Sequence, residues 1–379
     1  MKLLFASDSF KGSLTSEQTI KLLTKAAKEV FGDCETSGVP VADGGEGTVD
    51  AIVAAEKGEM VTCSVHGPLM ETMNARYGVF GGDRAVIEMS SASGLPLVPK
   101  EKRNPMNTTT YGTGELILDA LDKGYRDISI AIGGSATNDG GMGCARALGV
   151  RFLDESGNEL EGFGRDLLKL CSIDATNLDP RIKDCKITVM CDVTNPLCGE
   201  HGATRTFGAQ KGATKEIQEQ LEEGMCRYRD LIKKDFGIDC DTIKGAGAAG
   251  GLGAALCVFL GGNMKSGIDT VLDLIRFDER LEGVDIVVTG EGRTDWQSCF
   301  GKVMQGVGER AKNKGIPVLG LSGSLGKNAL DICEHGITSL MTTVNSPMTL
   351  DEAMEKAETL YFEAALRMFK FVKAGMELK

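Results

Sequence analysis

The sequence predicts an α/β protein in which a doubly wound parallel-sheet domain is built from both ends of the chain and a second α/β domain is inserted. Strand-like and helical patterns alternate over residues 1–61 and again over 284–379, which is typical of βαβ units and a parallel sheet. Residues 62–283 instead begin with close-set strands separated by turn signals. We therefore place the doubly wound domain at 1–61 and 284–379 and the inserted domain at 62–283.

The N-terminal segment predicts the order β-α-β-α. An apolar run at Lys2–Asp8 is followed by Thr15–Gln18, a capping box that begins a helix. Apolar residues recur on that helix at three- and four-residue spacing and form one stripe. Gly38–Val41 then leads through a glycine-rich loop into a second helix at Thr48–Glu56.

The C-terminal segment repeats this alternation. A capping box at Thr349–Glu352 predicts the start of one long amphipathic helix. The elements expected before it are a buried strand, a helix, a strand, a short helix and a strand, at Val284–Gly290, Gly301–Lys314, Ile316–Leu321, Lys327–Glu334 and Ile337–Thr343.

The inserted segment predicts a mixed or antiparallel sheet. Met60–Val65, Ala75–Phe80 and Ala85–Met89 are three short strand-like runs with turns between them. Two further strands are expected at Ile128–Ile132 and Lys186–Asp192, and an amphipathic helix is expected at Thr214–Phe236.

Composition narrows the class of protein. The chain has 379 residues and a net charge of −12, without a long Lys/Arg run, which argues against nucleic acid or an anionic membrane as a partner. Its longest weakly polar stretch, Gly245–Gly262, is too short to span a bilayer. The twelve Cys form no CxxC pair and the three His are scattered, which argues against zinc and haem sites. Twelve Cys in a sequence without a secretory leader favour free thiols in the cytoplasm. A homo-oligomer is compatible with these features.

Polar, glycine-rich segments follow four predicted strands of the doubly wound domain. Ligands of open α/β sheets bind beyond the carboxyl ends of the strands. Four segments with acidic, basic and glycine residues at one edge of the sheet favour a functional site at that edge over simple turns. They are Asp8–Ser13, Asp43–Thr48, Gly290–Asp295 and Ser322–Lys327.

Two glycine-rich segments of the insert allow two interpretations each. Gly133–Gly141 either presents backbone N–H groups to an anion or forms a tight strand–helix turn with Asn138 or Asp139 as N-cap. Gly245–Gly250 matches GxGxxG, but no clear strand precedes it, so close packing explains these glycines better than a dinucleotide site.

Asp192 lies at the end of an apolar strand, in the segment Cys191–Leu197. A carboxylate there is either a general base or metal ligand, or a capping residue in a turn. The sequence contains no Walker A motif, protein-kinase motif set or GxSxG. The residues alone therefore indicate an enzyme that acts on small anionic or phosphorylated substrates.

The motifs taken together resemble the bacterial glycerate kinase family of the first type. The matching segments occur in family order and cover most of the chain. They are Asp8–Ser13, Pro40–Thr48, Thr109–Ile117, Gly133–Gly141, Cys191–Leu197 and Gly290–Asp295. The resemblance implies transfer of the γ-phosphoryl group of ATP to D-glycerate with Mg²⁺, usually giving 2-phosphoglycerate. It also implies a Rossmann- or flavodoxin-like domain, a second domain that resembles a restriction-endonuclease fold, and a site in the cleft between them.

This resemblance suggests roles for individual residues. The candidate catalytic residues are Asp192, as the base toward the glycerate hydroxyl, with Lys11 and Asp43. The candidate ligands of Mg²⁺ are Asp43, Glu291 and Asp295. The candidate substrate- and phosphate-binding residues are Ser9, Gly44, Gly45, Glu46, Ser135, Asn138, Asp139, Asn195, Lys211, Glu291, Arg293 and Asp295.

Other functions stay open at this point. The same scaffold supports an ATP-dependent kinase of another small hydroxy acid, or a non-catalytic protein that binds a small ligand. An NAD-dependent dehydrogenase depends only on the weak match at Gly245–Gly250.

Overall fold

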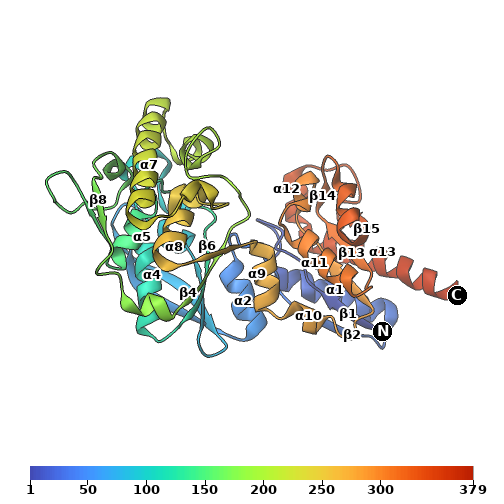
Figure 1. The fold of residues 1–379 in the computed structure, drawn as a ribbon. Helices are drawn as coiled ribbons and strands as arrows, with labels where there is room; N and C mark the ends of the chain where they lie inside the picture. Colours follow the sequence, from blue (N-terminus) through green and yellow to red (C-terminus); the bar gives the residue numbers. More distant parts are fainter. Residues whose placement is uncertain (379) are drawn as a thin grey trace. The chain divides into compact units, whose positions relative to one another are not determined.

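The computed structural model describes residues 1–378, which form two compact units (Figure 1). Unit 1 contains Met1–Asp43, Asp50–Glu56 and the segment that begins at Gly267. Unit 2 contains Gly44–Val49 and Lys57–Ser266. One unit has a parallel sheet and the other a mixed sheet, so the predicted fold class is confirmed. The domain boundaries at 61/62 and 283/284 stay a prediction.

Unit 1 is built on a five-stranded parallel sheet. Its spatial order is β15-β13-β11-β1-β2. Counted along the chain within this sheet, the order is 2-1-3-4-5, which is the flavodoxin-like arrangement. The order reverses between β1 and β11, which pair in parallel. The strands are β1 (Lys2–Phe5), β2 (Glu35–Gly38), β11 (Ile286–Thr289), β13 (Val318–Ser322) and β15 (Ile337–Thr342).

Helices cover both faces of this sheet. On one face, α1 (Ser16–Phe31) and α13 (Ala357–Glu377) share a core with Leu3 and Phe5 of β1. On the other face, α11 (Val303–Asn313) packs on β11 and β13. Figure 1 shows the N-terminal α1 beside the orange and red C-terminal elements. The doubly wound arrangement predicted from both chain ends is confirmed.

Three predicted elements of unit 1 differ in detail. β2 ends at Gly38, before Pro40, which has no N–H to donate to a neighbouring strand. The short helix expected near residue 327 is the 3₁₀ helix η10 (Ala329–His335). The expected long helix after Thr349 is divided into α12 (Leu350–Glu355) and α13, because the chain departs from helical geometry at Lys356 (φ −97°, ψ 13°).

The capping boxes predicted at Thr15 and Thr349 are both present. The remaining elements of the segments that contribute to unit 1 are short. They are α2 (Thr48–Glu56), α9 (Gly267–Leu274), α10 (Phe277–Arg280), β12 (Arg293–Thr294), η9 (Trp296–Cys299) and β14 (Ser324–Leu325).

Unit 2 contains a six-stranded mixed sheet in the order β10-β9-β6-β5-β4-β3. The β3–β4–β5 meander is antiparallel, whereas β5, β6, β9 and β10 run parallel. The expectation of a mixed sheet is therefore confirmed. The strands are β3 (Glu59–His66), β4 (Thr72–Phe80), β5 (Arg84–Glu88), β6 (Asp127–Ala131), β9 (Lys186–Met190) and β10 (Asn263–Lys265).

The helices of unit 2 pack on this sheet around one apolar core. The amphipathic helix expected at Thr214–Phe236 is α7. Its N-cap is Thr214, which accepts a hydrogen bond from Ile217 N at 3.3 Å. The helices are α3 (Ser90–Ser93), α4 (Tyr111–Asp122), α5 (Met142–Ala147), α6 (Ala203–Phe207), α7 (Lys215–Phe236) and α8 (Leu252–Leu260). A small antiparallel pair consists of β7 (Arg151–Leu153) and β8 (Ser172–Asp174).

Short 3₁₀ helices complete unit 2. They are η1 (Leu95–Leu97), η2 (Lys100–Lys102), η3 (Pro105–Asn107), η4 (Gly164–Leu168), η5 (Pro180–Asp184), η6 (Ala209–Lys211), η7 (Cys240–Thr242) and η8 (Ala248–Gly251). Across residues 1–378, no helix combines the length and the apolar character that crossing a bilayer requires. All twelve cysteines are free thiols.

Candidate active site

A cavity of about 800 Å³ lies in unit 1 at the carboxyl edge of the parallel sheet. Asp8 follows β1 and Glu291 follows β11, and both line this cavity. The two segments are joined by a hydrogen bond from Asp8 N to Gly290 O of 2.9 Å. Because the strand order reverses between β1 and β11, the cavity lies where open α/β sheets bind their ligands.

Three carboxylates share this cavity, namely Asp8, Asp43 and Glu291. Burial and the negative charges of Asp43 and Glu291 raise the pKa of Asp8 to about 7, although the N–H of Ser9 and the charge of Lys11 oppose the shift. The Ser9 N–H donates to Asp8 Oδ1 at 2.6 Å. A cation in the cavity would relieve the repulsion among these carboxylates.

Glu291 is held by hydroxyl groups of its own loop. Its side chain is buried, and its Oε1 accepts hydrogen bonds from Thr294 Oγ1 at 3.0 Å and from Ser298 Oγ. The pKa of Glu291 is raised by burial, and the hydrogen bonds from the two hydroxyl groups only partly oppose this rise. The donors fix one carboxylate oxygen and so orient the group.

Cationic side chains line the same cavity. Lys11 follows β1, Arg293 lies on β12, and Lys302 precedes α11. The Arg293 Nε atom lies 3.5 Å from Asp295 Oδ2, while Asp295 Oδ1 accepts from Gln297 N at 2.9 Å. Both oxygens of Asp295 are thus engaged, and Asp295 is not among the residues that line the cavity.

The structure brings together five of the residues predicted for the site. Ser9, Lys11, Asp43, Glu291 and Arg293 all line the cavity of unit 1. Asp295 is also in unit 1 but does not line the cavity. The others are in unit 2, on the segments before α2, before α5 and after β9, and on η6. They are Gly44, Gly45, Glu46, Ser135, Asn138, Asp139, Asp192, Asn195 and Lys211.

Asp139 organises the turn between β6 and α5. It is fully buried, and its Oδ2 accepts from the N–H and the hydroxyl of Thr110, both at 2.7 Å. Its Oδ1 accepts from Gly141 N at 3.0 Å, and the N–H of Gly140 donates to Gly250 O at 2.9 Å. These two N–H groups are bonded within unit 2, which agrees with a tight turn. The N-cap of α5 is Gly141, however, rather than Asn138 or Asp139.

Lys211 lies inside unit 2. Its Nζ atom donates to Thr137 O at 2.7 Å, and burial lowers its pKa to about 7 while the charge of Asp139 opposes that shift. Next to Thr137, the Nδ2 of Asn138 donates to Thr204 Oγ1 at 2.9 Å. The buried Thr137 Oγ1 and Asn138 Oδ1 have no hydrogen-bond partner among the described residues.

Asp192 is exposed on the segment that follows β9. The predicted strand reaches Asp192, but β9 ends at Met190. The extended backbone continues one residue further, because Cys191 N donates to Lys265 O at 2.9 Å. Asn195 fixes the next part of this segment by donating from Nδ2 to His201 O at 2.7 Å.

The glycines of the GxGxxG match serve close packing. The match follows the 3₁₀ helix η7 rather than a strand. A Cβ atom on Gly247 would lie 2.1 Å from Pro196 O, and one on Gly250 would lie 2.1 Å from Thr137 O. The structure therefore has no strand–glycine loop–helix arrangement of a dinucleotide site at this position.

Two charged residues of the cavity were not among the predicted site residues. Asp8 is the first residue of the Asp8–Ser13 motif, and its place directly after the first strand is the signal that could have identified it. Lys302 reaches the cavity from the residue before α11, and no local pattern distinguishes it from a solvated lysine.

The glycerate kinase family model matches residues 3–373. The chain belongs to the glycerate kinase family. It is 48% identical to glycerate 2-kinase of Escherichia coli K12 over 99% of both chains. It is 47% identical to a glycerate kinase of Halalkalibacterium halodurans over 96% of both chains. A crystal structure of a candidate glycerate kinase 2 from Salmonella typhimurium LT2 is 43% identical, with a TM-score of 0.91 over 100% of this chain and 99% of the other.

The resemblance found in the motifs is thereby confirmed. As a member of the glycerate kinase family, the chain is an enzyme and a phosphotransferase. The charged cavity of unit 1 is consistent with this chemistry, because phosphoryl transfer depends mainly on positioning and on neutralising negative charge.

Proposed function

We propose that this enzyme transfers the γ-phosphoryl group of ATP to D-glycerate and forms 2-phosphoglycerate. The observation that carries the proposal is the cavity at the point where the strand order of unit 1 reverses. It combines three carboxylates with Lys11, Arg293 and Lys302. The name of the relative from Escherichia coli, glycerate 2-kinase, supports the choice of the 2-hydroxyl group.

Mg²⁺ fits the carboxylates of this cavity. The ion prefers one or two carboxylates together with phosphate oxygens. Asp43 and Glu291 are the candidate ligands retained from the sequence, and Asp8 is added because its carboxylate lines the same cavity. Asp295 is the weaker candidate, since both its oxygens are engaged. When bound, Mg²⁺ would neutralise charge on the phosphates.

The remaining roles follow the chemistry of the acceptor. Lys11 and Arg293 are proposed to bind phosphate or the glycerate carboxylate as cations. Asp192 of unit 2 is proposed to orient the glycerate hydroxyl and accept its proton. We place the reaction in the cytoplasm, because all twelve cysteines are free thiols.

A coupled assay of ADP release tests the proposal. We expect turnover with ATP, Mg²⁺ and D-glycerate, and none with L-glycerate as the control. Phosphorus NMR of the product then distinguishes the 2-phosphate from the 3-phosphate. Turnover only with a different hydroxy acid would contradict the substrate, and a 3-phosphate product would contradict the position.

A further inference from the structure

Unit 2 brings together three side chains of types that commonly bind metal ions, two cysteines and a glutamate. Glu222 and Cys226 lie one turn apart on α7, and Cys198 is on the segment between β9 and α6. Two sulfurs and one carboxylate oxygen from these residues all lie within 4.8 Å of one another. We propose that Cys198, Glu222 and Cys226 form a binding site for a divalent, sulfur-preferring cation such as Zn²⁺. This site is separate from the proposed reaction.

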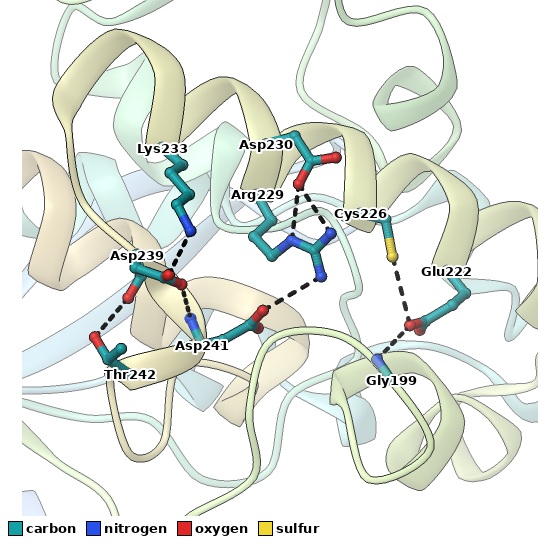
Figure 2. Close-up of polar contacts among 9 residues, drawn as sticks. All are labelled: Gly199, Glu222, Cys226, Arg229, Asp230, Lys233, Asp239, Asp241 and Thr242. Carbon is teal, nitrogen blue, oxygen red and sulfur yellow. Dashed lines mark hydrogen bonds and ion pairs between the residues drawn. The ribbon is translucent and has the colours of Figure 1, made fainter.

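Glu222 provides an observation that is independent of the clustering. Its side chain is 9% exposed. Its Oε1 accepts from Gly199 N at 2.6 Å and from Cys226 Sγ at 3.8 Å, as Figure 2 shows. Its buried Oε2 has no hydrogen-bond partner among the described residues. Because a buried carboxylate oxygen without a partner is costly, this atom is available to a cation.

The donor set selects the class of ion. Zn²⁺ binds thiolates at about 2.3 Å in tetrahedral geometry, which places two sulfur ligands about 3.8 Å apart. The separations of up to 4.8 Å among the three donors need only small side-chain adjustments to reach this geometry. Mg²⁺ and Ca²⁺ prefer oxygen ligands, so two sulfurs disfavour them. Three protein ligands leave the fourth position to water.

The surrounding charges are compatible with a cation. Burial raises the pKa of both the Cys198 and Cys226 thiols above the usual value, so the ion would displace two thiol protons. Arg229 is the nearby positive group, and its charge only partly opposes this rise. Figure 2 shows it paired with Asp230 at 2.8 Å and with Asp241 at 3.3 Å. These carboxylates neutralise part of the charge that would oppose the ion.

The bound ion would tie a loop to a helix. Gly199, the neighbour of Cys198, already donates its N–H to Glu222 on α7. An ion held by Cys198, Glu222 and Cys226 would add a second link between the same two segments. We therefore expect it to stabilise unit 2 rather than to take part in phosphoryl transfer.

The test uses the full-length, reduced and metal-free protein. Zn²⁺ is titrated in competition with a chromophoric chelator, and Co²⁺ is used as a second probe because thiolate ligands give it a charge-transfer absorption. We expect one ion per chain with this absorption. Glu222→Gln, which keeps an acceptor for Gly199 N, and Cys226→Ser should each weaken binding about 10-fold or more.

A double variant of exposed cysteines, Cys171→Ser with Cys333→Ser, is the matched control. It should bind the ion as the wild type does, and Zn²⁺ should raise the melting temperature of both. Glu222→Gln, read by melting as well as by binding, keeps the test informative if Cys226→Ser fails to fold.

Equal binding by wild type and Glu222→Gln would overturn the proposal. So would loss of binding in the control. A Cys198–Cys226 disulfide with no bound ion, found by mass spectrometry of the protein before reduction, would identify a redox pair instead.

Discussion

Asp8 carries a cost in the folded protein that it does not carry in the unfolded chain. Its pKa rises from 3.8 to about 7, first through burial and then through the charges of Asp43 and Glu291. Since the folded state holds this proton more tightly, Asp8 lowers the free energy of unfolding as the pH rises from about 4 to 7. A pKa shift of this size corresponds to a loss of at most about 4 kcal/mol in the free energy of unfolding.

We therefore expect Asp8→Asn to stabilise the protein at pH 8. The amide keeps an acceptor for the Ser9 N–H and removes the charge. Without substrates, the gain should be about 1–3 kcal/mol at pH 8 and should vanish near pH 4. Unfolding curves measured across this pH range check it. A difference between variant and wild type that does not change with pH would contradict the raised pKa. If Asp8 helps to hold Mg²⁺, the stabilised variant should also lose turnover.

Substitution of Asp192 tests its proposed role as the base. Asp192→Asn should lower kcat by about 100-fold or more with little change in the affinity for nucleotide. Asp184 provides the matched control, because it is also exposed and lies beyond the opposite end of β9. Asp184→Asn should leave kcat unchanged. Near-normal turnover of Asp192→Asn in steady-state kinetics would rule out this role.

At the scale of elements, the glycines around the β6–α5 turn determine how closely segments approach. Gly250 has φ +68°, and its added Cβ would lie 2.1 Å from Thr137 O. Gly237, at the end of α7, has φ +71° but open space around it. Both substitutions to alanine share the cost of a left-handed backbone, about 1–2 kcal/mol. Only Gly250→Ala adds a clash with backbone.

We expect Gly250→Ala to lower stability by about 2 kcal/mol or more beyond Gly237→Ala. The melting temperatures of the two variants give the comparison directly. Equal losses would mean that the segments can separate slightly without cost, and that close packing does not explain the glycine.

At the scale of the whole molecule, unit 2 has its own sheet and its own apolar core. We expect residues 57–266 to unfold cooperatively when expressed alone. The sequence-predicted insert, 62–283, should be less stable because it lacks the first residues of β3, which begins at Glu59 and pairs with β4. Calorimetry of both fragments tests the division. A fragment 57–266 without a cooperative transition would contradict an independently folding domain.

Interactions between residues close together in the sequence made much of the fold predictable. The helices that begin after Thr15 and Thr349 were located because a cap needs only residues three positions apart. The helix that begins after Thr214 was located by its amphipathic pattern. The break at Lys356 was not predicted, since the apolar pattern continues through it. The end of β9 was placed two residues too late, because the extended backbone at Cys191 is paired by a single bond to Lys265 rather than by a ladder.

The candidate site was predictable to a similar degree. Ser9, Lys11, Asp43, Glu291 and Arg293 were identified from glycine-rich motifs and line one cavity. Those motifs do not distinguish a side chain that faces a ligand from one that holds a turn. Asp139 shows the difference, because both its oxygens are bonded to its own unit.

The sequence by itself determined the family, the α/β alternation and the helix starts, because motifs and caps depend on residues close together in the chain. Tertiary structure decided which charges meet. It raised the pKa of Asp8 by burying this carboxyl group and by placing Asp43 and Glu291 nearby, and it gathered Cys198 with Glu222 and Cys226 although no CxxC pattern exists. Burial and Coulomb interactions depend on distances that only the folded chain fixes.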